Sequence, residues 1–402
     1  MLFATFPVVC RLVYMQQNSH IADPSWVGKL HNGPTVWSAI LCGLLASCAS
    51  AAQTVTYPFL GVTLYQRTET SPRPLKISVA EIDLAAPGIS FLMTPRGPAP
   101  QPVYNGVPDE TVIQTTRQFV NSSGAQLAIN ASYYDISNIH TVNGLSWTNN
   151  LGLTASEGDV YSPWLNETHT DNNYDDALNI TANNSASIVK MPSNGRNGYG
   201  TTPSVTLYNT VTGKNRLLTN GALSAPSSCT ICGLNPRTAV GLTAGNTKLI
   251  MMTIDGRRTG VSEGVTLVEL AGYLDDYGVT NAINLDGGGS TQMAANYYND
   301  GQNARLVNTP SESERSVGTN LGVFALPNGD FNLNGTIDAG DYVVWRKSVG
   351  GTLGYTAWRS RYGAAGGSGT ELDSSAIPEP TALPLLATLI AATWLRARHR
   401  AI

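Results

Sequence analysis

The sequence predicts an α+β protein with an α/β-like core, in which flanking helices cover a mixed β-sheet and a small helical segment follows. Three neighbouring stretches indicate this core. Residues 248–254 are an apolar run of strand length, residues 265–277 carry apolar side chains at helical spacing, and residues 282–285 are a second apolar run. A strand, a helix and a strand within about 40 residues are typical of a β-α-β unit.

The central helix has signals at both ends. Thr266 and Glu269 stand three residues apart at its start, which is the spacing of a capping box. Gly278 follows its last turn, where glycine commonly ends a helix. A similar order recurs upstream, where residues 110–120 predict a helix, Gly124 ends it, and residues 126–129 predict a strand.

Polar residues follow each of these strands. A crossover helix makes the two downstream strands parallel, so their carboxyl ends meet at one edge of the sheet. Asp255 follows the first strand, Asp286 follows the second, and Asn130 follows the upstream strand. Ligands of open α/β sheets bind at this edge. We therefore expect Asp255, Asp286 and Asn130 to share one site.

The glycine-rich run after the second strand is the most informative stretch. Asp286 is followed by Gly287, Gly288, Gly289, Ser290 and Thr291. Three glycines let the backbone approach a ligand and can aim successive N–H groups at an anion, which predicts a phosphate-binding nest. The run matches neither the P-loop nor the G-x-G-x-x-G pattern, so nucleotide binding is disfavoured. A tight turn requiring positive φ is the alternative for any one glycine.

Five segments, in this order, resemble the motifs of the phosphodiester glycosidase (N-acetylglucosamine-1-phosphodiester alpha-N-acetylglucosaminidase) family. They are residues 235–241, 255–257, 262–271, 284–291 and 315–320. The resemblance implies a domain at residues 53–326 that hydrolyses a sugar-1-phosphodiester to the sugar and a phosphomonoester. The chain reads Asn-Ala-Ser-Tyr from Asn130 to Tyr133, where the family commonly has an Asn-Gly-Gly-Phe-type element, and this leaves the shape of one pocket wall open.

Such a hydrolysis requires an anion clamp, a carboxylate near the anomeric carbon and a base for water. Asp286 is the first candidate for the carboxylate, as base, nucleophile or electrostatic stabiliser, and Asp255 is the second. We assign Arg237 and Arg315 to the phosphate because a guanidinium offers two parallel donors. Asx turns for the aspartates and ion pairs for the arginines are the alternatives. Without the carboxylate separation, retention and inversion both stay open.

The remaining candidates would bind substrate. Asn130, Ser290, Thr291 and the three glycines would contact sugar hydroxyls or phosphate, with a structural role as the alternative for each. None of the motifs contains histidine, so a Ser-His-Asp mechanism and a metal-dependent phosphatase or nuclease are unsupported. The net charge of −4 does not indicate binding of nucleic acid, which requires a basic surface.

Cys229 and Cys232 stand in a loop-like segment, and we expect them to form a local disulfide. A redox or metal role is the alternative. The other three cysteines lie in residues 1–52, which we interpret as a signal peptide region because residues 36–52 are apolar and end in small residues. A lipoprotein cleavage box ending at Cys48 is the alternative there.

The C-terminus carries a second targeting pattern. Residues 378–380 read Pro-Glu-Pro, an apolar stretch follows, and a basic cluster ends the chain. Residues 378–402 resemble the PEP-CTERM sorting signal, which implies a membrane-associated tail, sorting machinery as a partner and a secreted, cell-envelope location. Residues 364–377 predict a flexible linker. A buried C-terminal helix is the alternative for the tail.

An acidic and amide-rich loop precedes this linker. Oxygen-bearing side chains recur at the ligand positions of an EF-hand loop, with Gly335 at the turn: they are Asp330, Asn332, Asn334, Thr336, Asp338 and Asp341. The loop resembles a dockerin type I loop, so residues 328–363 would bind Ca²⁺ and a cohesin-like partner. A solvated Asx-rich turn without metal is the alternative.

The sequence supports two other functions besides hydrolysis of a sugar phosphate or envelope polysaccharide. A carbohydrate- or polymer-binding module with no catalysis would bind sugar without turnover. A dockerin-type attachment protein would bind its partner in a calcium-dependent way without hydrolysis.

Overall fold

The computed structural model describes residues 51–365, apart from 105, 165–173, 194, 196–197, 298–302 and 349–350. Nearly all of the predicted signal peptide region and linker, and the whole predicted sorting tail, lie outside the described residues. None of the helices within the described ranges is long and apolar enough to cross a membrane.

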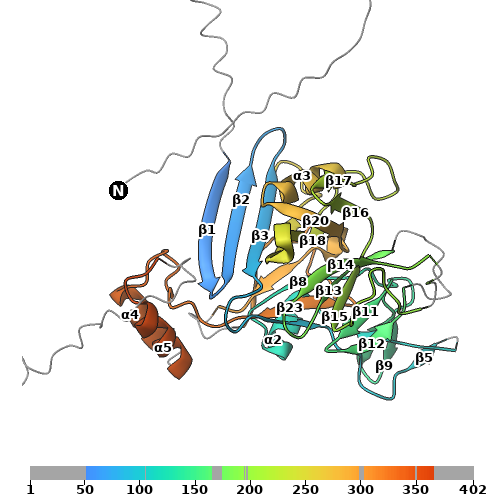
Figure 1. Cartoon of the computed structure of the whole chain (residues 1–402), viewed down its shortest axis with the longest axis horizontal. Coiled ribbons are helices and arrows are strands. Elements are labelled where there is room, and N and C mark those ends of the chain that lie inside the picture. The colour runs from blue at the N-terminus through green and yellow to red at the C-terminus, as the bar shows by residue number, and fades with distance from the viewer. Residues whose placement is uncertain are drawn as a thin grey trace, which may run out of the picture. The chain divides into compact units, whose positions relative to one another are not determined.

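The largest sheet has eight strands and is antiparallel throughout (Figure 1). In spatial order its strands are β1 (Ala52–Phe59), β2 (Val62–Glu69), β3 (Leu75–Asp83), β19 (Lys248–Ile254), β18 (Arg237–Thr243), β20 (Val279–Asn284), β16 (Arg216–Thr219) and β17 (Ala222–Leu223).

Four smaller sheets accompany it in the part of the chain that the structure describes. One has the order β22 (Arg305–Leu306), β21 (Met293–Ala295), β8 (Leu127–Asn130), β23 (Asn320–Phe324) and β4 (Ser90–Met93). Another has the order β12 (Asp159–Ser162), β11 (Thr154–Ser156), β15 (Asn209–Gly213), β13 (Asp176–Ile180) and β14 (Ala186–Lys190). The two smallest are β7 (Thr111–Val112), β10 (Leu145–Thr148), β9 (His140–Val142), and the hairpin β5 (Val103–Tyr104), β6 (Val107–Pro108).

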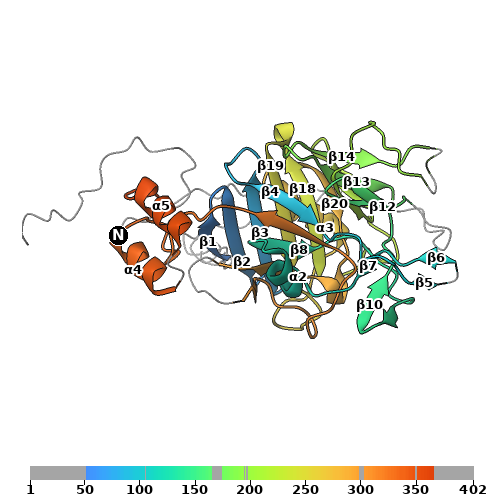
Figure 2. The same cartoon turned by 90° about the horizontal axis from the view of Figure 1, so that it is seen from below.

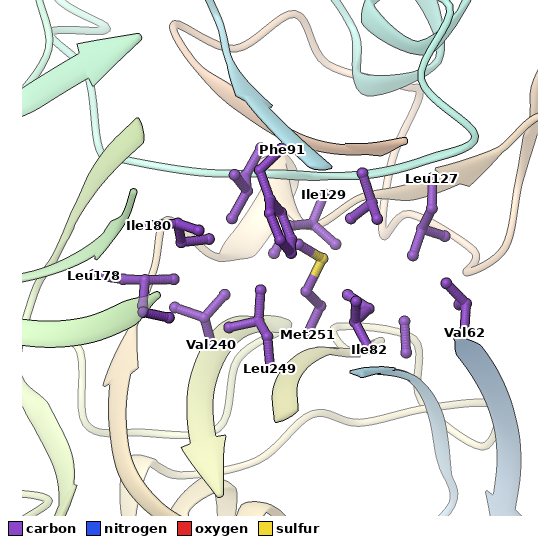
Figure 3. Packing of buried hydrophobic residues seen from close by; sticks show 14 of the residues in the cluster. Val62, Ile82, Phe91, Leu127, Ile129, Leu178, Ile180, Val240, Leu249 and Met251 are labelled. Carbon is purple, nitrogen blue, oxygen red and sulfur yellow. The ribbon is translucent and has the colours of Figure 1, made fainter. Parts of the chain in front are cut away.

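The main core lies where these sheets face one another (Figure 3). Side chains alternate across a strand, so Leu249 and Met251 of β19 enter this core. Met252 and Ile254, on the opposite face, pack under helix α3 (Leu267–Asp275) in a second core. Both faces of β19 are therefore buried, which explains its unbroken apolar sequence.

Helix α3 confirms the predicted end signals. The Thr266 hydroxyl accepts the Glu269 N–H, and a Glu269 carboxylate oxygen accepts the Thr266 N–H at 2.8 Å, which completes the capping box. The upstream helix is shorter than predicted. It is α2 (Thr116–Ser123), because residues 111–112 pair as β7, and it ends at Gly124 with φ 78°. Helix α2 lies beside β8 in both Figure 1 and Figure 2.

The predicted β-α-β unit is wrong in one respect. Strands β19 and β20 do point the same way, but β18 lies between them and is antiparallel to both. The core is consequently richer in strands and more antiparallel than the predicted mixed sheet. The carboxyl ends of β19 and β20 nevertheless share an edge, and the start of β18 joins them there.

Residues 328–365 form a helical segment that contains α4 (Ala339–Ser348) and α5 (Thr352–Arg361). Two short 3₁₀ turns lie in the sheet domain, η1 (Ala244–Asn246) and η2 (Gly288–Ser290). Phe331, Ile337 and Trp358 form the core of the helical segment. Ala364 is buried against them and its carbonyl accepts the Ile337 N–H at 3.0 Å. Ala364 and Ala365 thus belong to this segment, and the predicted linker boundary at residue 364 is wrong.

Candidate active site

The site lies at the edge where three strands of the large sheet meet. Arg237, the first residue of β18, pairs with Ile254 at the end of β19. Asn284, the last residue of β20, pairs with Ala239 of β18. The residues that follow β19 and β20, Asp255 and Asp286, therefore emerge at this edge, as the sequence predicts.

Asp286 is a half-buried carboxyl held by the turn that follows it. The Ser290 hydroxyl, the Arg315 guanidinium and the Gly287 N–H lie close enough to favour its charged form. Burial outweighs these three effects and raises the pKa of Asp286 to about 6. The backbone of Asp286 is fixed as well, because its N–H donates to Ala131 O at 3.1 Å and its carbonyl accepts the Asn130 amide at 2.7 Å.

The glycine-rich run does not form the predicted nest. The N–H of Gly288 donates to Pro236 O, that of Ser290 to Gly287 O, and that of Thr291 to Gly288 O. Together with the Gly287 N–H, which serves Asp286, most donors of the run are used within the protein. Residues 288–290 form η2 instead, and Gly288 has φ 62°, which favours glycine.

The absent glycine side chains make room for two arginines. A Cβ on Gly289 would lie 2.6 Å from Cζ of Arg315, and a Cβ on Gly288 would lie 2.9 Å from Nη2 of Arg257. Arg257 is exposed, has φ 60°, and donates from Nη2 to Asn235 Oδ1 at 3.0 Å. The anion-binding potential of this turn therefore comes from guanidinium groups rather than from backbone N–H groups.

Arg257 was not among the residues predicted for the site. It belongs to the segment 255–257 that carries the family resemblance, and this was the available signal. Its place against Gly288 depends on a left-handed backbone conformation, which no local pattern of the sequence indicates.

Two tyrosines border the same carboxyl. Asp286 contributes to raising the pKa of both Tyr133 and Tyr134, after burial, which is the larger cause. The Asn284 amide Nδ2 donates to the Tyr133 hydroxyl at 3.0 Å, and the Tyr134 hydroxyl donates to Ser316 O at 3.1 Å. Both tyrosines are thus neutral donors at ordinary pH.

Arg237 does not face an open site. It is 2% exposed, and its guanidinium donates to the carbonyls of Val265, Ile231 and Gly233. Burial lowers its pKa. These contacts fix the loop that contains Cys229 and Cys232, which form the expected local disulfide. The structure thus gives Arg237 a positioning role in place of the predicted phosphate contact.

Asp255 is buried and is joined to the turn through one asparagine, Asn308. Its carboxylate accepts Asn308 Nδ2 at 2.9 Å and the Thr309 N–H at 3.0 Å, and burial raises its pKa to about 6. The same Asn308 amide also donates to Thr291 O at 3.2 Å. Asp255 therefore anchors the segment after β22, and the structure shows no contact that joins it to Asp286.

Three predicted substrate-binding side chains are buried: that of Ser290, which lies beside Asp286, and those of Asn130 and Thr291. The Asn130 amide oxygen accepts the Thr238 hydroxyl at 2.7 Å and the Gln292 N–H at 3.0 Å. With its bond to Asp286 O, Asn130 thus connects three strands and the glycine turn. The Thr291 hydroxyl is also buried and has no partner among the described residues. Neither the Asn130 nor the Thr291 side chain reaches the surface, so both shape the site from behind.

The predicted calcium loop folds around two buried carboxylates. Asp330 accepts the N–H groups of Asn334 and Gly335, and Asp341 accepts those of Asn332 and Asp338. The side chains of Asn332, Asn334 and Asp338 accept N–H groups two residues further on. Within the described ranges, no three His, Cys, Asp or Glu side chains gather closely enough to hold a metal by themselves.

The fold and the site together define a β-rich protein with a carboxylate-and-guanidinium site at one sheet edge. The sequence model of the phosphodiester glycosidase family matches residues 123–324, just over half of the chain. The chain therefore belongs to the phosphodiester glycosidase family. No curated protein matches the chain.

Three solved structures are similar to the chain over 69% of its length. A hypothetical protein from Synechocystis has 14% identity, a TM-score of 0.47 and 64% of its own length covered. The zebrafish N-acetylglucosamine-1-phosphodiester alpha-N-acetylglucosaminidase catalytic domain, auto-inhibited by its pro-peptide, has 20% identity, a TM-score of 0.44 and 84% of its own length covered. A putative exported protein from Burkholderia pseudomallei has 13% identity, a TM-score of 0.46 and 97% of its own length covered. Family membership rests on the family model alone.

Proposed function

We propose that the chain is a secreted hydrolase that cleaves a sugar-1-phosphodiester, resembling an N-acetylglucosamine-1-phosphodiester, into free sugar and a phosphomonoester. One observation carries the proposal. The Asp286 carboxyl, with a pKa of about 6, lies on a glycine turn against which the guanidinium groups of Arg257 and Arg315 are packed. A carboxylate beside an anion clamp is what this reaction needs.

The two arginines would hold the phosphate. Arg315 is half-buried and Arg257 is exposed, so both can present donors to a ligand at the turn. A guanidinium matches the oxygens of a phosphodiester with two parallel N–H groups. Asn235 and the left-handed backbone at Arg257 hold that side chain against Gly288 before substrate arrives, which lowers the entropic cost of binding.

Asp286 would act at the anomeric carbon. The bond between that carbon and the phosphate oxygen breaks, and its electron pair stays on the phosphate, where the arginines stabilise the charge. Water supplies the new oxygen on the sugar. Asp286, largely ionised at neutral pH, either takes the proton from this water or first bonds to the carbon and is then released by water.

Tyr133 would supply a hydrogen bond. The Asn284 amide nitrogen can only donate, so the Tyr133 oxygen accepts that bond and its own proton stays available for another acceptor. The raised pKa of Tyr133 keeps the hydroxyl protonated. We propose that it donates to the departing phosphate oxygen or to a sugar hydroxyl.

The decisive experiment compares the full chain with its Asp286→Asn variant on N-acetylglucosamine-1-phosphodiesters and other sugar-1-phosphodiesters. We expect the wild type to release reducing sugar and phosphomonoester in equal amounts, and the variant to lose at least about 10³-fold in rate. No release by the wild type across several sugars would overturn the proposal. Sugar binding that survives in the variant, without turnover by the wild type, would identify a non-catalytic binding module.

We also propose that residues 328–363 bind Ca²⁺ as an attachment segment. The donor set is all oxygen, which suits Ca²⁺. Asp330 and Asp341 are buried, and in the described part of the chain neither forms an ion pair with a basic side chain. A cation would balance these charges. A cohesin-like partner and an envelope location through the tail belong to the same proposal.

A further inference from the structure

We propose that the substrate's aglycone, the group beyond the phosphate, is an apolar chain such as that of a lipid-linked sugar phosphate. The inference rests on the proposed function and names the class of its substrate. Its binding surface is a group of exposed apolar side chains on two neighbouring hairpins, which we call the hairpin patch: Val103, Tyr104, Val107, Ile136, Ile139, Val142 and Leu145.

The two hairpins form one surface. The ring of Tyr104, in β5, stacks on His140, at the start of β9, with 3.8 Å between the centroids. His140 Nδ1 lies 3.3 Å from the buried carboxylate of Asp109, just after β6. Both Figure 1 and Figure 2 show this hairpin region at the same end of the sheet domain. The patch is therefore held together rather than made of separate residues.

The patch continues directly from the proposed site. Tyr134 is affected electrostatically by both Asp286 and Arg315, and its hydroxyl donates to Ser316 O, next to Arg315. The N–H of Ile136 donates to Tyr134 O at 3.0 Å. Two residues span at most about 7 Å. The backbone of Ile136, the first patch residue in these segments after Tyr134, is thus bonded to a residue that borders the anion clamp.

The division of charge across this surface matches an amphiphile. Residues 97–108 and 136–150, which carry both hairpins, contain no Asp, Glu, Lys or Arg. The adjoining site carries two guanidinium groups and the Asp286 carboxyl, and Glu312 Oε2 lies 3.7 Å from Nη2 of Arg315. A phosphodiester bound to the arginines would direct one substituent, the sugar, to Asp286 and the other toward the uncharged patch. An apolar chain gains most from the exposed apolar side chains, and a charged aglycone finds no opposite charge in these two segments.

The exposure of the patch also indicates a ligand. Val103 is 64% exposed and Ile136 is 55% exposed. Exposed apolar residues scattered singly are ordinary, but a connected group beside a polar site is typical of a binding surface. A tyrosine at the rim of such a surface keeps its hydroxyl in water while its ring contacts the chain.

The test measures kcat/KM of the full chain for two N-acetylglucosamine-1-phosphodiesters, one with a methyl and one with a decyl aglycone, both below the micellar concentration. The test variant is Val103→Thr/Ile136→Thr/Val142→Thr, which keeps β-branched side chains but makes them polar. The control is Val55→Thr/Val343→Thr, which changes exposed valines of β1 and α4.

We expect the wild type and the control to prefer the decyl substrate by about tenfold or more, equivalent to about 1.4 kcal/mol. The test variant should lower this preference to about twofold while its rate on the methyl substrate is unchanged. An equal rate for both substrates in the wild type, or a preference that survives in the test variant, would overturn the inference. So would a change of oligomeric state in the variant with an unchanged preference, because the patch would then be a subunit interface.

Failure of the proposed function is separable from failure of this inference. If neither diester is cleaved, the hydrolase proposal fails, and calorimetry with methyl phosphate and decyl phosphate then decides the inference alone. Tighter binding of decyl phosphate by the wild type than by the test variant would support an apolar subsite. Equal affinity for both phosphates would exclude it.

Discussion

The carboxyl of Asp286 sets the pH at which the site can work. Burial raises its pKa to about 6, so the ionised form that the reaction needs is lost below that pH. We expect log kcat/KM to rise with pH up to about 6 and then to level off. A profile that is flat from pH 5 to pH 8 would exclude Asp286 as the reacting carboxylate.

Asp255 is the necessary control, because its pKa is raised to about the same value. Its carboxylate contacts Asn308 and Thr309, and Asn308 in turn bonds Thr291 O at the end of the glycine turn. The Asp255→Asn variant should be less stable but should keep the inflection near pH 6. Loss of the inflection in this variant would transfer the catalytic role to Asp255.

A third carboxyl affects stability rather than catalysis. Burial raises the pKa of Glu110 from 4.5 to about 7, although Asn150 donates to it from its N–H at 2.8 Å and from its side chain at 3.2 Å. Folding therefore favours the neutral form. The contribution of neutral Glu110 to the free energy of unfolding is fully present below about pH 4.5 and is lost as the pH rises through about 7.

The Glu110→Gln variant should remove the loss of stability above pH 4.5, because glutamine does not ionise. Its amide oxygen can still accept the hydrogen bonds from Asn150. We expect its free energy of unfolding to exceed the wild-type value by about 1–3 kcal/mol at pH 8, and the difference to vanish near pH 4. Urea denaturation at both pH values measures it, with Glu157→Gln at an exposed side chain as the control. A variant that is less stable than the wild type at pH 8 would contradict this account.

At the scale of single elements, the turn η2 depends on glycine because two arginine guanidinium groups occupy the space that a Cβ atom would need. Gly289 has no left-handed φ, so alanine fits its backbone, but the new Cβ would meet the Arg315 guanidinium. We expect Gly289→Ala to displace Arg315 and lower kcat/KM by about 10- to 100-fold with little change in stability. Kinetics and thermal unfolding of the same sample measure both.

The matched control is Gly272→Ala in α3, where a Cβ meets nothing within 4 Å. This change should leave kcat/KM unaltered and stabilise the protein by about 0.5–1 kcal/mol. If Gly289→Ala also retains full activity, Arg315 does not need its place against the turn.

The elements that the sequence predicts well are those with local signals. Strand β19, helix α3 with its capping box, and the strand before Asp286 follow from apolar periodicity and end residues. The place of β18 between β19 and β20 could not be predicted, because strand order depends on pairing between distant segments. The same reason applies to the site residues. Asp286 and Arg315 lie at one turn, whereas the partners of Arg237 are loop carbonyls that carry no sequence pattern.

For the molecule as a whole, calcium should act on the helical segment and not on hydrolysis. Its predicted ligands lie in residues 330–341, whereas the Asp286 site is built from residues up to 316. We expect calorimetry of the full chain to show binding of about one Ca²⁺, weakened at least about tenfold by Asp341→Ala, with kcat/KM equal in calcium and in chelator. No binding at millimolar Ca²⁺, or hydrolysis that requires it, would refute this.

The late strand β23 has a consequence for when the site comes into existence. It lies between β8 and β4, and it pairs Asn320 with Asn130, which are 190 residues apart in the chain. Contacts of such long sequence separation form slowly, and none of them can form before residue 324 has been synthesised. The strand of Asn130, whose amide holds Asp286, is therefore completed only by a segment that follows the site residues in the sequence. We therefore expect the Asp286 site to form only after β23 has been synthesised.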